Sequence, residues 1–156
     1  MKRLTYLLLL SVLFFSCSEA DNNARSEVES LIDKWHGLSA KADAQYFDLM
    51  TDSAVFIGTD KTEVWPKKEF MDFALPRFAE GDGWEFKVLS RNIYSKDGIY
   101  WFDEQLDTWM GICQASGVVV REKGSWKIAH YQLSLTIEND LIEAFKALST
   151  KEQAEE

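Results

Sequence analysis

The strongest constraint on the fold is a hairpin pattern late in the chain. Two runs rich in β-branched and aromatic residues, 117–122 and 126–134, flank the short break Lys123-Gly124-Ser125. This pattern predicts two antiparallel strands joined by a turn that contains glycine. The hairpin therefore needs a layer that covers its apolar face.

The side chains that share that face depend on the length of the loop. With an odd number of loop residues, period-2 alternation predicts one face composed of Val118, Val120, Trp126, Ile128, His130 and Gln132. A face that ends in His130 and Gln132 suits a strand that lines a pocket, and equally a strand that leaves the core for solvent. His130 is thus either a wall residue or a catalytic one.

The preceding segment predicts a second hairpin. Residues 84–94 and 99–109 alternate in polarity and are joined at Lys96-Asp97-Gly98, and residues 110–122 and 126–137 continue the meander. In this pairing Arg91 lies opposite Glu104 or Asp103, which predicts a cross-strand ion pair on a solvated face.

The first half of the chain has a helical period. Apolar residues at three- and four-residue spacing predict a helix over 24–42, in which His36 near the end has an exposed or capping role. Next come a short helix capped by Asp43 (43–50) and a strand (54–58). A third helix begins at Trp65-Pro66, and Pro76 is expected to kink or shorten its end. A last helix after Asn139 has one apolar face, made of Leu141, Ile142, Phe145 and Leu148. Helices followed by a meander predict an α+β domain with a curved, mainly antiparallel sheet.

The N-terminus predicts export. Lys2 and Arg3 precede an apolar run over 4–15, which is too short to span a membrane and is typical of a signal peptide. The segment 13–17, which ends in Ser16-Cys17, resembles a bacterial lipobox. We therefore expect a signal peptide (1–16), a tether lipidated at Cys17 (17–23), a domain (24–148) and a frayed tail (149–156), anchored to a membrane on its periplasmic side or at the cell surface.

The net charge and the cysteine content exclude two kinds of interaction, nucleic-acid binding and an internal disulfide. The formal net charge is −9, and removal of Lys2 and Arg3 with the signal peptide makes it −11. Such an acidic chain repels phosphates, so we expect no nucleic-acid partner. Once Cys17 is lipidated, Cys113 has no partner for a disulfide and is expected in the core.

Several segments resemble the SnoaL-like branch of the nuclear transport factor 2-like superfamily. They are residues 52–60 (DSAVFIGTD), 101–104 (WFDE), 116–121 (SGVVVR) and 126–134 (WKIAHYQLS). The resemblance implies a cone in which a curved sheet and the first helices enclose a pocket open at one end. Members of the superfamily include isomerases, dehydratases, cyclases and association domains, so the fold alone does not define the function.

The resemblance also suggests site residues. Enzymes of this superfamily often use an aspartate as acid/base, sometimes with a histidine, and Asp103 and His130 are the candidates here. Tyr94, Trp101, Gln132 and Trp65 are the candidates for ligand-binding wall residues. The two histidines, His36 and His130, lie on different elements, and the sequence has neither a metal motif nor a phosphate loop, so we expect no metal and no cofactor.

Three functions remain open. The chain could bind a small, largely apolar molecule in the cone or act as an accessory module. It could be an acid/base enzyme of the isomerase or dehydratase type that uses Asp103 and His130. It could also be a homodimeric interaction domain that associates through the outer face of its sheet.

Overall fold

The computed structural model describes the backbone of residues 2–152 and the side chains of residues 21–149. The elements follow one another in the order α1 (Lys2–Ala40), η1 (Ala44–Leu49), β1 (Met50–Ile57), β2 (Val64–Pro66), α2 (Lys67–Ala79), β3 (Lys87–Lys96), β4 (Ile99–Thr108), β5 (Gly111–Glu122), β6 (Ser125–Leu135), η2 (Asn139–Leu141) and α3 (Ile142–Glu152).

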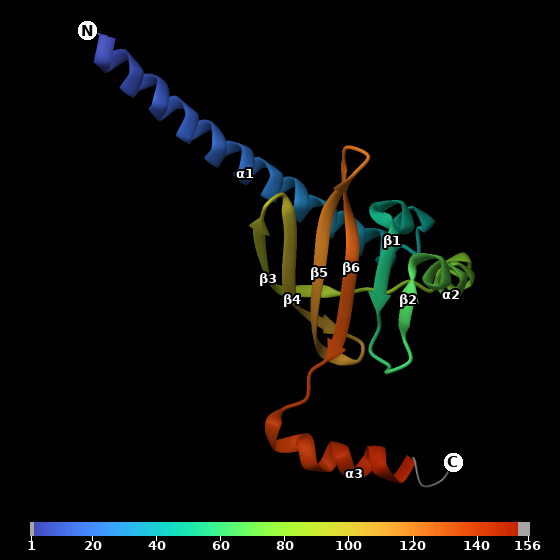
Figure 1. Ribbon diagram of the computed structural model, residues 1–156. Helices are drawn as coiled ribbons and strands as arrows, with labels where there is room; N and C mark the ends of the chain where they lie inside the picture. Colours follow the sequence, from blue (N-terminus) through green and yellow to red (C-terminus); the bar gives the residue numbers. More distant parts are fainter. Residues whose placement is uncertain (1, 153–156) are drawn as a thin grey trace.

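One curved, six-stranded sheet organises the domain. Its strand order is β2-β1-β6-β5-β4-β3, with β1 and β6 parallel and the other neighbours antiparallel. Figure 1 shows α1 crossing behind the sheet and α2 beside β1 and β2. Trp35 of α1 contacts Tyr131, and Phe70 of α2 contacts Phe56, the neighbour of Tyr131 in the sheet, so both helices lie on the same side. This arrangement confirms the predicted α+β class and the cone of helices packed in a curved sheet.

The two long hairpins have two-residue loops. Asp97 and Gly98 have φ values of 52° and 79°, and Lys123 and Gly124 have φ values of 51° and 84°. Positive φ at both central residues is the signature of a type I′ turn, whose twist matches that of the flanking strands. The odd-numbered loop expected for the hairpin of β5 and β6 is therefore wrong.

A β-bulge changes the register further. Val119 pairs with Ile128 and Val118 pairs with His130, so Ala129 is an extra residue on β6. Trp126 and Ile128 face the helices as expected. Val118, Val120, His130 and Gln132 do not share that face, because the even loop places the two valines opposite the expected side and the bulge turns β6 by one residue.

The prolines also differ from expectation. Trp65 and Pro66 belong to β2, and α2 begins at Lys67 with Pro66 as its N-cap residue, so the helix starts directly after the predicted position. Pro76 lies inside α2 and the helix continues to Ala79. Proline removes one donor without preventing the remaining turn from forming when the surrounding residues are packed. Asp43 caps η1 as predicted, since its Oδ1 accepts from the N–H of Gln45 at 2.9 Å.

The two faces of the sheet differ in burial. Along β4, Tyr100, Phe102, Glu104 and Leu106 are buried on the side of the helices, which we call the inner face. The alternate residues, such as Asp103, are exposed on the opposite side, which we call the outer face. Cys113 is fully buried on the inner face, as expected for a core residue.

The two ends of the described chain differ, because Asp21 accepts a hydrogen bond from the Tyr100 hydroxyl of β4 at 2.7 Å, whereas α3 lies apart from the sheet. Residues 21–23, expected in the tether, are helical and belong to α1. Figure 1 shows α3 below the end of the sheet that β6 leaves, separated from the body of the domain. Among residues 21–149, whose side chains the structure describes, no helix is long and apolar enough to cross a membrane. The predicted signal peptide and Cys17 lie outside this range.

Candidate functional site: an aromatic cavity

A cavity of about 450 Å³ opens at the end of the cone. Its walls come from the inner side of β1 and β2, from α2, from the segment 82–86 and from the β4–β5 turn. This volume is within the range of sites for small molecules. The aromatic side chains that line it are Tyr46, Phe56, Trp65, Phe70, Phe73, Trp84, Phe86 and Trp109.

Several of these rings are nearly parallel. The plane of Phe70 lies within 14° of Phe56, 9° of Trp65 and 24° of Trp84, with centroid distances of 4.0, 5.5 and 5.9 Å. Phe73 completes the set, at 25° from Trp65 and 14° from Trp84. Parallel rings present flat apolar surfaces of one orientation, against which another flat group can stack.

Polar groups lie at the rim of the cavity. The Arg77 guanidinium is 5.9 Å from the Phe73 ring centroid and 5.7 Å from that of Trp84, and its Nη2 is 2.5 Å from Asp82 Oδ2. Arg77 therefore already occupies the place over these rings where the cation of a ligand could otherwise bind. Glu63 supplies a second carboxylate, from the loop that joins β1 and β2.

Two loops meet at the rim of the cavity, the loop after β1 and the turn between β4 and β5. Thr59, after β1, contacts Met110 Sδ through its hydroxyl at 3.8 Å, and the neighbouring Trp109 is 82% exposed. The Gly58 N–H donates to the Glu63 carbonyl at 2.9 Å, and a Cβ at Gly58 would lie only 2.0 Å from Glu63 Oε2. Glycine therefore lets the Glu63 side chain fold down over the loop.

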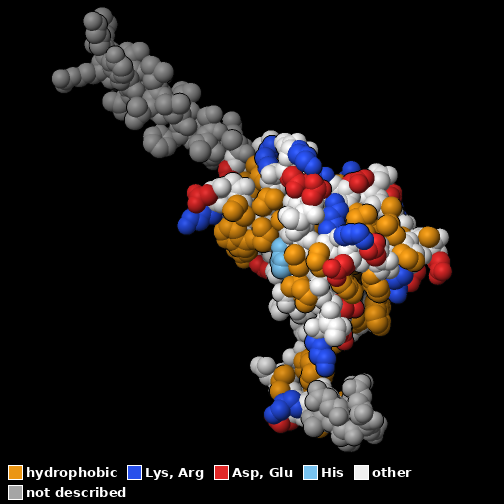
Figure 2. Space-filling view, turned by 45° about the vertical axis from the view of Figure 1, so that its right-hand side comes forward, with side chains coloured by type: hydrophobic (Ala, Val, Ile, Leu, Met, Phe, Trp, Pro, Cys, Tyr) orange, Lys and Arg blue, Asp and Glu red, His pale blue; other side chains and the backbone are white. Residues whose placement is uncertain are grey.

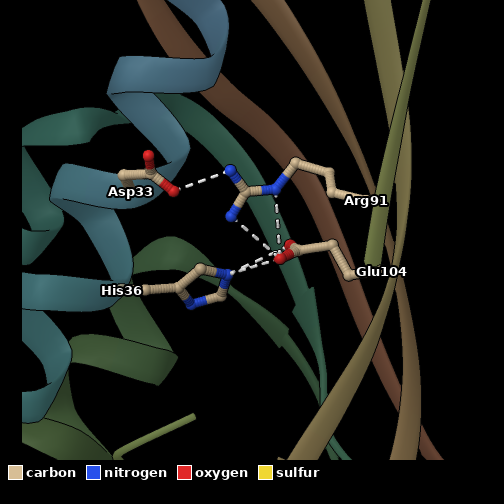
Figure 3. A network of polar contacts seen from close by, with 4 residues as sticks. All are labelled: Asp33, His36, Arg91 and Glu104. Atoms are coloured by element: carbon tan, nitrogen blue, oxygen red, sulfur yellow. Dashed lines mark hydrogen bonds and ion pairs between the residues drawn. The ribbon is translucent and has the colours of Figure 1, made fainter. Parts of the chain in front are cut away.

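A buried network of charged side chains lies deeper in the cone (Figure 3). Glu104 has a fully buried side chain, and its carboxylate contacts His36 Nε2 at 3.0 and 3.2 Å. Arg91 donates to Glu104 Oε2 from Nε at 3.3 Å and from Nη2 at 3.0 Å. Its Nη1 donates to Asp33 at 2.7 Å, so the network ties α1 to β3 and β4.

The surroundings of this network shift two pKa values. Burial alone would lower the pKa of Arg91, but its hydrogen bonds and ion pairs with Asp33 and Glu104 raise it. Burial, and then the nearby Glu104 charge, raises the pKa of Tyr131 well above its usual range. The Tyr131 hydroxyl is buried and has no hydrogen-bond partner within the described part of the chain.

One layer of side chains separates the network from the cavity. The Phe86 ring lines the cavity and contacts the His36 ring edge-to-face, at 5.8 Å and 79°. Both Glu104 oxygens are engaged, and neither His36 nor Glu104 is among the cavity-lining residues. The network therefore fixes the wall of the cavity from behind.

Only one of the predicted wall residues reaches the cavity. Trp65 lines it, whereas Tyr94, Trp101 and Gln132 lie exposed on the outer face. The two candidate acid/base residues are also outside, because Asp103 is on the outer side of β4 and His130 pairs with Val118 there.

The outer-face residues make contacts of their own. Asp103 accepts from Asn92 Nδ2 at 2.9 Å, and a hydrogen bond to Asp103 raises the pKa of Tyr94. These contacts lie on the side of the sheet away from the helices. Asp103 and His130 thus do not share the helix-covered cavity that the acid/base hypothesis requires.

The exposed or capping role expected for His36 is wrong, because its side chain is buried. Sequence reasoning also did not predict that His36 meets Glu104, although signals for the burial of both were present. His36 follows Ile32 by four residues and so shares its apolar helix face. Glu104 follows Phe102 by two and so shares its strand face. Arg91 does pair with Glu104, but the pair is buried rather than solvated as expected. Among residues 21–149, no group of three or more acidic, histidine or cysteine side chains could hold a metal ion.

A curved sheet closed by helices around one open-ended cavity defines a cone-shaped α+β domain of the nuclear transport factor 2-like type. The chain belongs to the SnoaL-like domain family, whose model matches residues 28–138. No curated protein matches it.

Solved structures share the fold at low sequence identity. One is a protein of unknown function from Pseudomonas putida KT2440, with 14% identity, a TM-score of 0.64 and coverage of 76% of this chain and 91% of that one. Another is a putative dehydratase from Streptomyces avermitilis, with 11% identity, a TM-score of 0.65 and coverage of 76% and 99%. A putative calcium/calmodulin-dependent protein kinase II association domain from Xanthomonas campestris has 18% identity, a TM-score of 0.54 and coverage of 72% and 87%. At these identities the likeness shows the fold alone.

Proposed function

We propose that this chain binds a small, largely apolar molecule with a flat ring in the aromatic cavity. The near-parallel rings around Phe70 are the observation that carries the proposal. A planar group that stacks against the exposed face of a wall ring gains aromatic contacts and loses its apolar hydration. The rim groups Arg77, Asp82 and Glu63 are placed to orient a polar end of the ligand near solvent.

We also propose that the protein works outside the cytoplasm as a lipoprotein anchored at Cys17. The basic start, the short apolar run and the lipobox-like segment 13–17 support this proposal. Mass spectrometry of the membrane-extracted protein should show a diacylglyceryl group on Cys17. An unmodified Cys17 in the mature chain would contradict the anchoring.

The acid/base alternative is less well supported. It requires Asp103 and His130 in the cavity, and both lie on the outer face. The interior does hold an acid and a histidine, Glu104 and His36, but their groups are paired with each other and with Arg91 behind the Phe86 wall. We interpret this pair as structural.

Binding can be tested with N-phenyl-1-naphthylamine, a neutral aromatic probe whose fluorescence increases in apolar sites. Phe73 is a suitable position because it lines the cavity and is partly exposed, so its truncation spares the buried core. We expect Phe73→Ala to weaken probe binding about tenfold, which corresponds to one lost aromatic contact of about 1.4 kcal/mol.

The matched control is Tyr94→Ala, which removes a similarly exposed ring from the outer face. It should leave the probe affinity unchanged. Equal losses in the two variants, or no binding by the wild type, would contradict the proposed function.

A further inference from the structure

The C-terminal segment of η2 and α3 presents an apolar stripe to solvent. The stripe consists of Leu141, Ile142, Phe145 and Leu148, which are between 38% and 68% exposed. Figure 2 shows this segment as a lobe below the body of the domain, with hydrophobic side chains on its surface. α3 has 11 residues, and a helix of this length is marginal in water without a packed face. The stripe therefore needs an apolar surface to cover it.

The mouth of the aromatic cavity also exposes apolar side chains. Trp109, in the turn between β4 and β5, lines the cavity and is 82% exposed, and Phe73 of α2 lines it and is 42% exposed. Leu135, at the end of β6, is 44% exposed. It pairs with Cys113 on the inner face and follows the cavity-lining Leu133. Exposed apolar groups that gather around one opening are typical of a surface that binds another apolar group.

The chain that leads to α3 is fixed at this mouth. β6 lies between β1 and β5 and runs parallel to β1, so it ends between the two loops that meet at the rim. Thr136 donates to the Ile112 carbonyl from its N–H at 3.1 Å and from its hydroxyl at 2.6 Å. The link from Thr136 to η2 is only residues 137–138, and two extended residues span about 7 Å. The stripe therefore begins next to the rim.

The length and the position of α3 favour the mouth as its partner. A helix that packs on a sheet lies roughly 10 Å from it, and 11 helical residues extend about 16 Å. A helix that starts at the end of β6 thus reaches across to Phe73 on α2. Figure 1 shows the start of α1 and α3 at opposite ends of the molecule, so a lipid anchor at Cys17 would hold the stripe away from the membrane.

We propose that the stripe closes over the cavity mouth of its own chain and forms the outer wall of the ligand site. Phe145 and Leu148 then contact the exposed sides of Trp109 and Phe73, and the structure shows the open arrangement. The inference deepens the proposed ligand binding and rests on it, because an apolar ligand enlarges the surface that the stripe covers. Such a site favours a compact ligand that the cavity of about 450 Å³ encloses over a long one that protrudes.

The first test measures cross-linking and needs no ligand. Thr59→Cys places a thiol on the exposed rim and Leu148→Cys places one on the stripe. The full chain with both changes is reconstituted in phosphatidylcholine vesicles and treated with a short bismaleimide. Cys113 is buried, and the parent chain reports any reaction of Cys17. We expect internal linkage about tenfold faster than in the pair Tyr94→Cys and Leu148→Cys, because Tyr94 lies near the β3–β4 turn at the other end of the sheet.

Phe145→Ser separates docking of the stripe from simple proximity of a tethered helix. Added to the rim and stripe cysteines, it should slow internal linkage about tenfold, the effect of one lost aromatic contact. The matched control is Ala147→Ser, which lies on the opposite side of the helix and should leave the rate unchanged.

Three outcomes would overturn the proposal. Linkage that is equally fast with Phe145→Ser would show that the stripe does not dock. Linkage only between two chains would assign the stripe to a second copy. Linkage no faster than in the pair with Tyr94→Cys would assign it to the lipid surface or to solvent. Circular dichroism of each variant checks that the domain remains folded.

The second test measures the release of N-phenyl-1-naphthylamine, followed by energy transfer from the cavity tryptophans Trp65 and Trp84. Phe145→Ser should speed release about tenfold, because it removes one aromatic contact of the outer wall, and Ala147→Ser should not change it. Equal release rates in Phe145→Ser and the wild type would overturn the assignment of the stripe to the ligand site. If the wild type does not bind the probe, the proposed function fails, and the cross-linking still decides whether the stripe closes over the mouth.

Discussion

The two faces of β4 use the same kind of residue for different purposes. Glu104 and Asp103 are neighbours in the sequence, but the first is fully buried among His36 and Arg91 while the second is exposed beside Asn92. A buried charge needs its partners, because removal of one leaves the others desolvated and unpaired. An exposed carboxylate is solvated with or without them. The loss of stability caused by a substitution should therefore be large at inner-face positions and small at the outer-face positions that alternate with them along each strand.

The largest expected effect is that of Glu104→Gln. The amide keeps the shape but removes the charge that Arg91 and His36 contact, and we expect the free energy of unfolding to fall by about 3–5 kcal/mol. Urea unfolding followed by circular dichroism measures the change. Asp103→Asn is the matched control on the outer face and should change stability by less than about 1 kcal/mol. Similar losses in the two variants would contradict the distinction between the faces.

A second pair of neighbours tests packing instead of charge. Gly117 is on the inner face of β5, where an added Cβ would lie 2.5 Å from the Phe102 ring and 3.0 Å from the His130 carbonyl oxygen. Because one obstacle is backbone, Gly117→Ala should destabilise the protein by about 1–3 kcal/mol. Ser116→Ala, on the outer face, should stay within about 0.5 kcal/mol in the same unfolding measurement. If Gly117→Ala were neutral, the inner face would have to be looser than the structure shows.

The smallest effect at neutral pH is expected for Tyr131→Phe. Its hydroxyl is buried without a partner among the side chains described, so its removal should be neutral or stabilise by up to about 1 kcal/mol.

The same variant should change the alkaline behaviour of the protein. The folded-state pKa of Tyr131 is raised by burial and then by Glu104. Below about pH 10 both the folded and the unfolded chain keep the phenol proton, and above it the unfolded chain releases the proton first. Stability should therefore decrease as the pH rises above about 10, and less steeply in Tyr131→Phe. Thermal melts between pH 8 and 11 measure the slope, and identical slopes in the two proteins would exclude this contribution.

The sequence predicted more of the fold than of the site. The helical period around Trp35, the alternation along β4 and the turn glycines were enough to predict an α+β domain with a curved, mainly antiparallel sheet, and the family resemblance added the cone. The candidate site was harder to predict from the sequence. To assign His130 and Gln132 to a face of the sheet, one must know the loop length and the bulge at Ala129. A shift of one residue reverses every side chain of a strand. The ion pair of Arg91 and Glu104 was expected on a solvated face for the same reason, because the face of these two strands could not be assigned from the sequence.

By itself, the sequence determined the alternation of helix and strand patterns, because these depend on local spacing and on turn residues such as Gly98 and Gly124. It also predicted the pairing of Arg91 with an acid on β4. Only the tertiary structure decided that Glu104 and His36 meet inside the cone, that the parallel rings around Phe70 line a cavity, and that Asp103 and His130 face outward. The physical reason is that burial depends on which elements pack on each side of the sheet, and no local pattern contains that information.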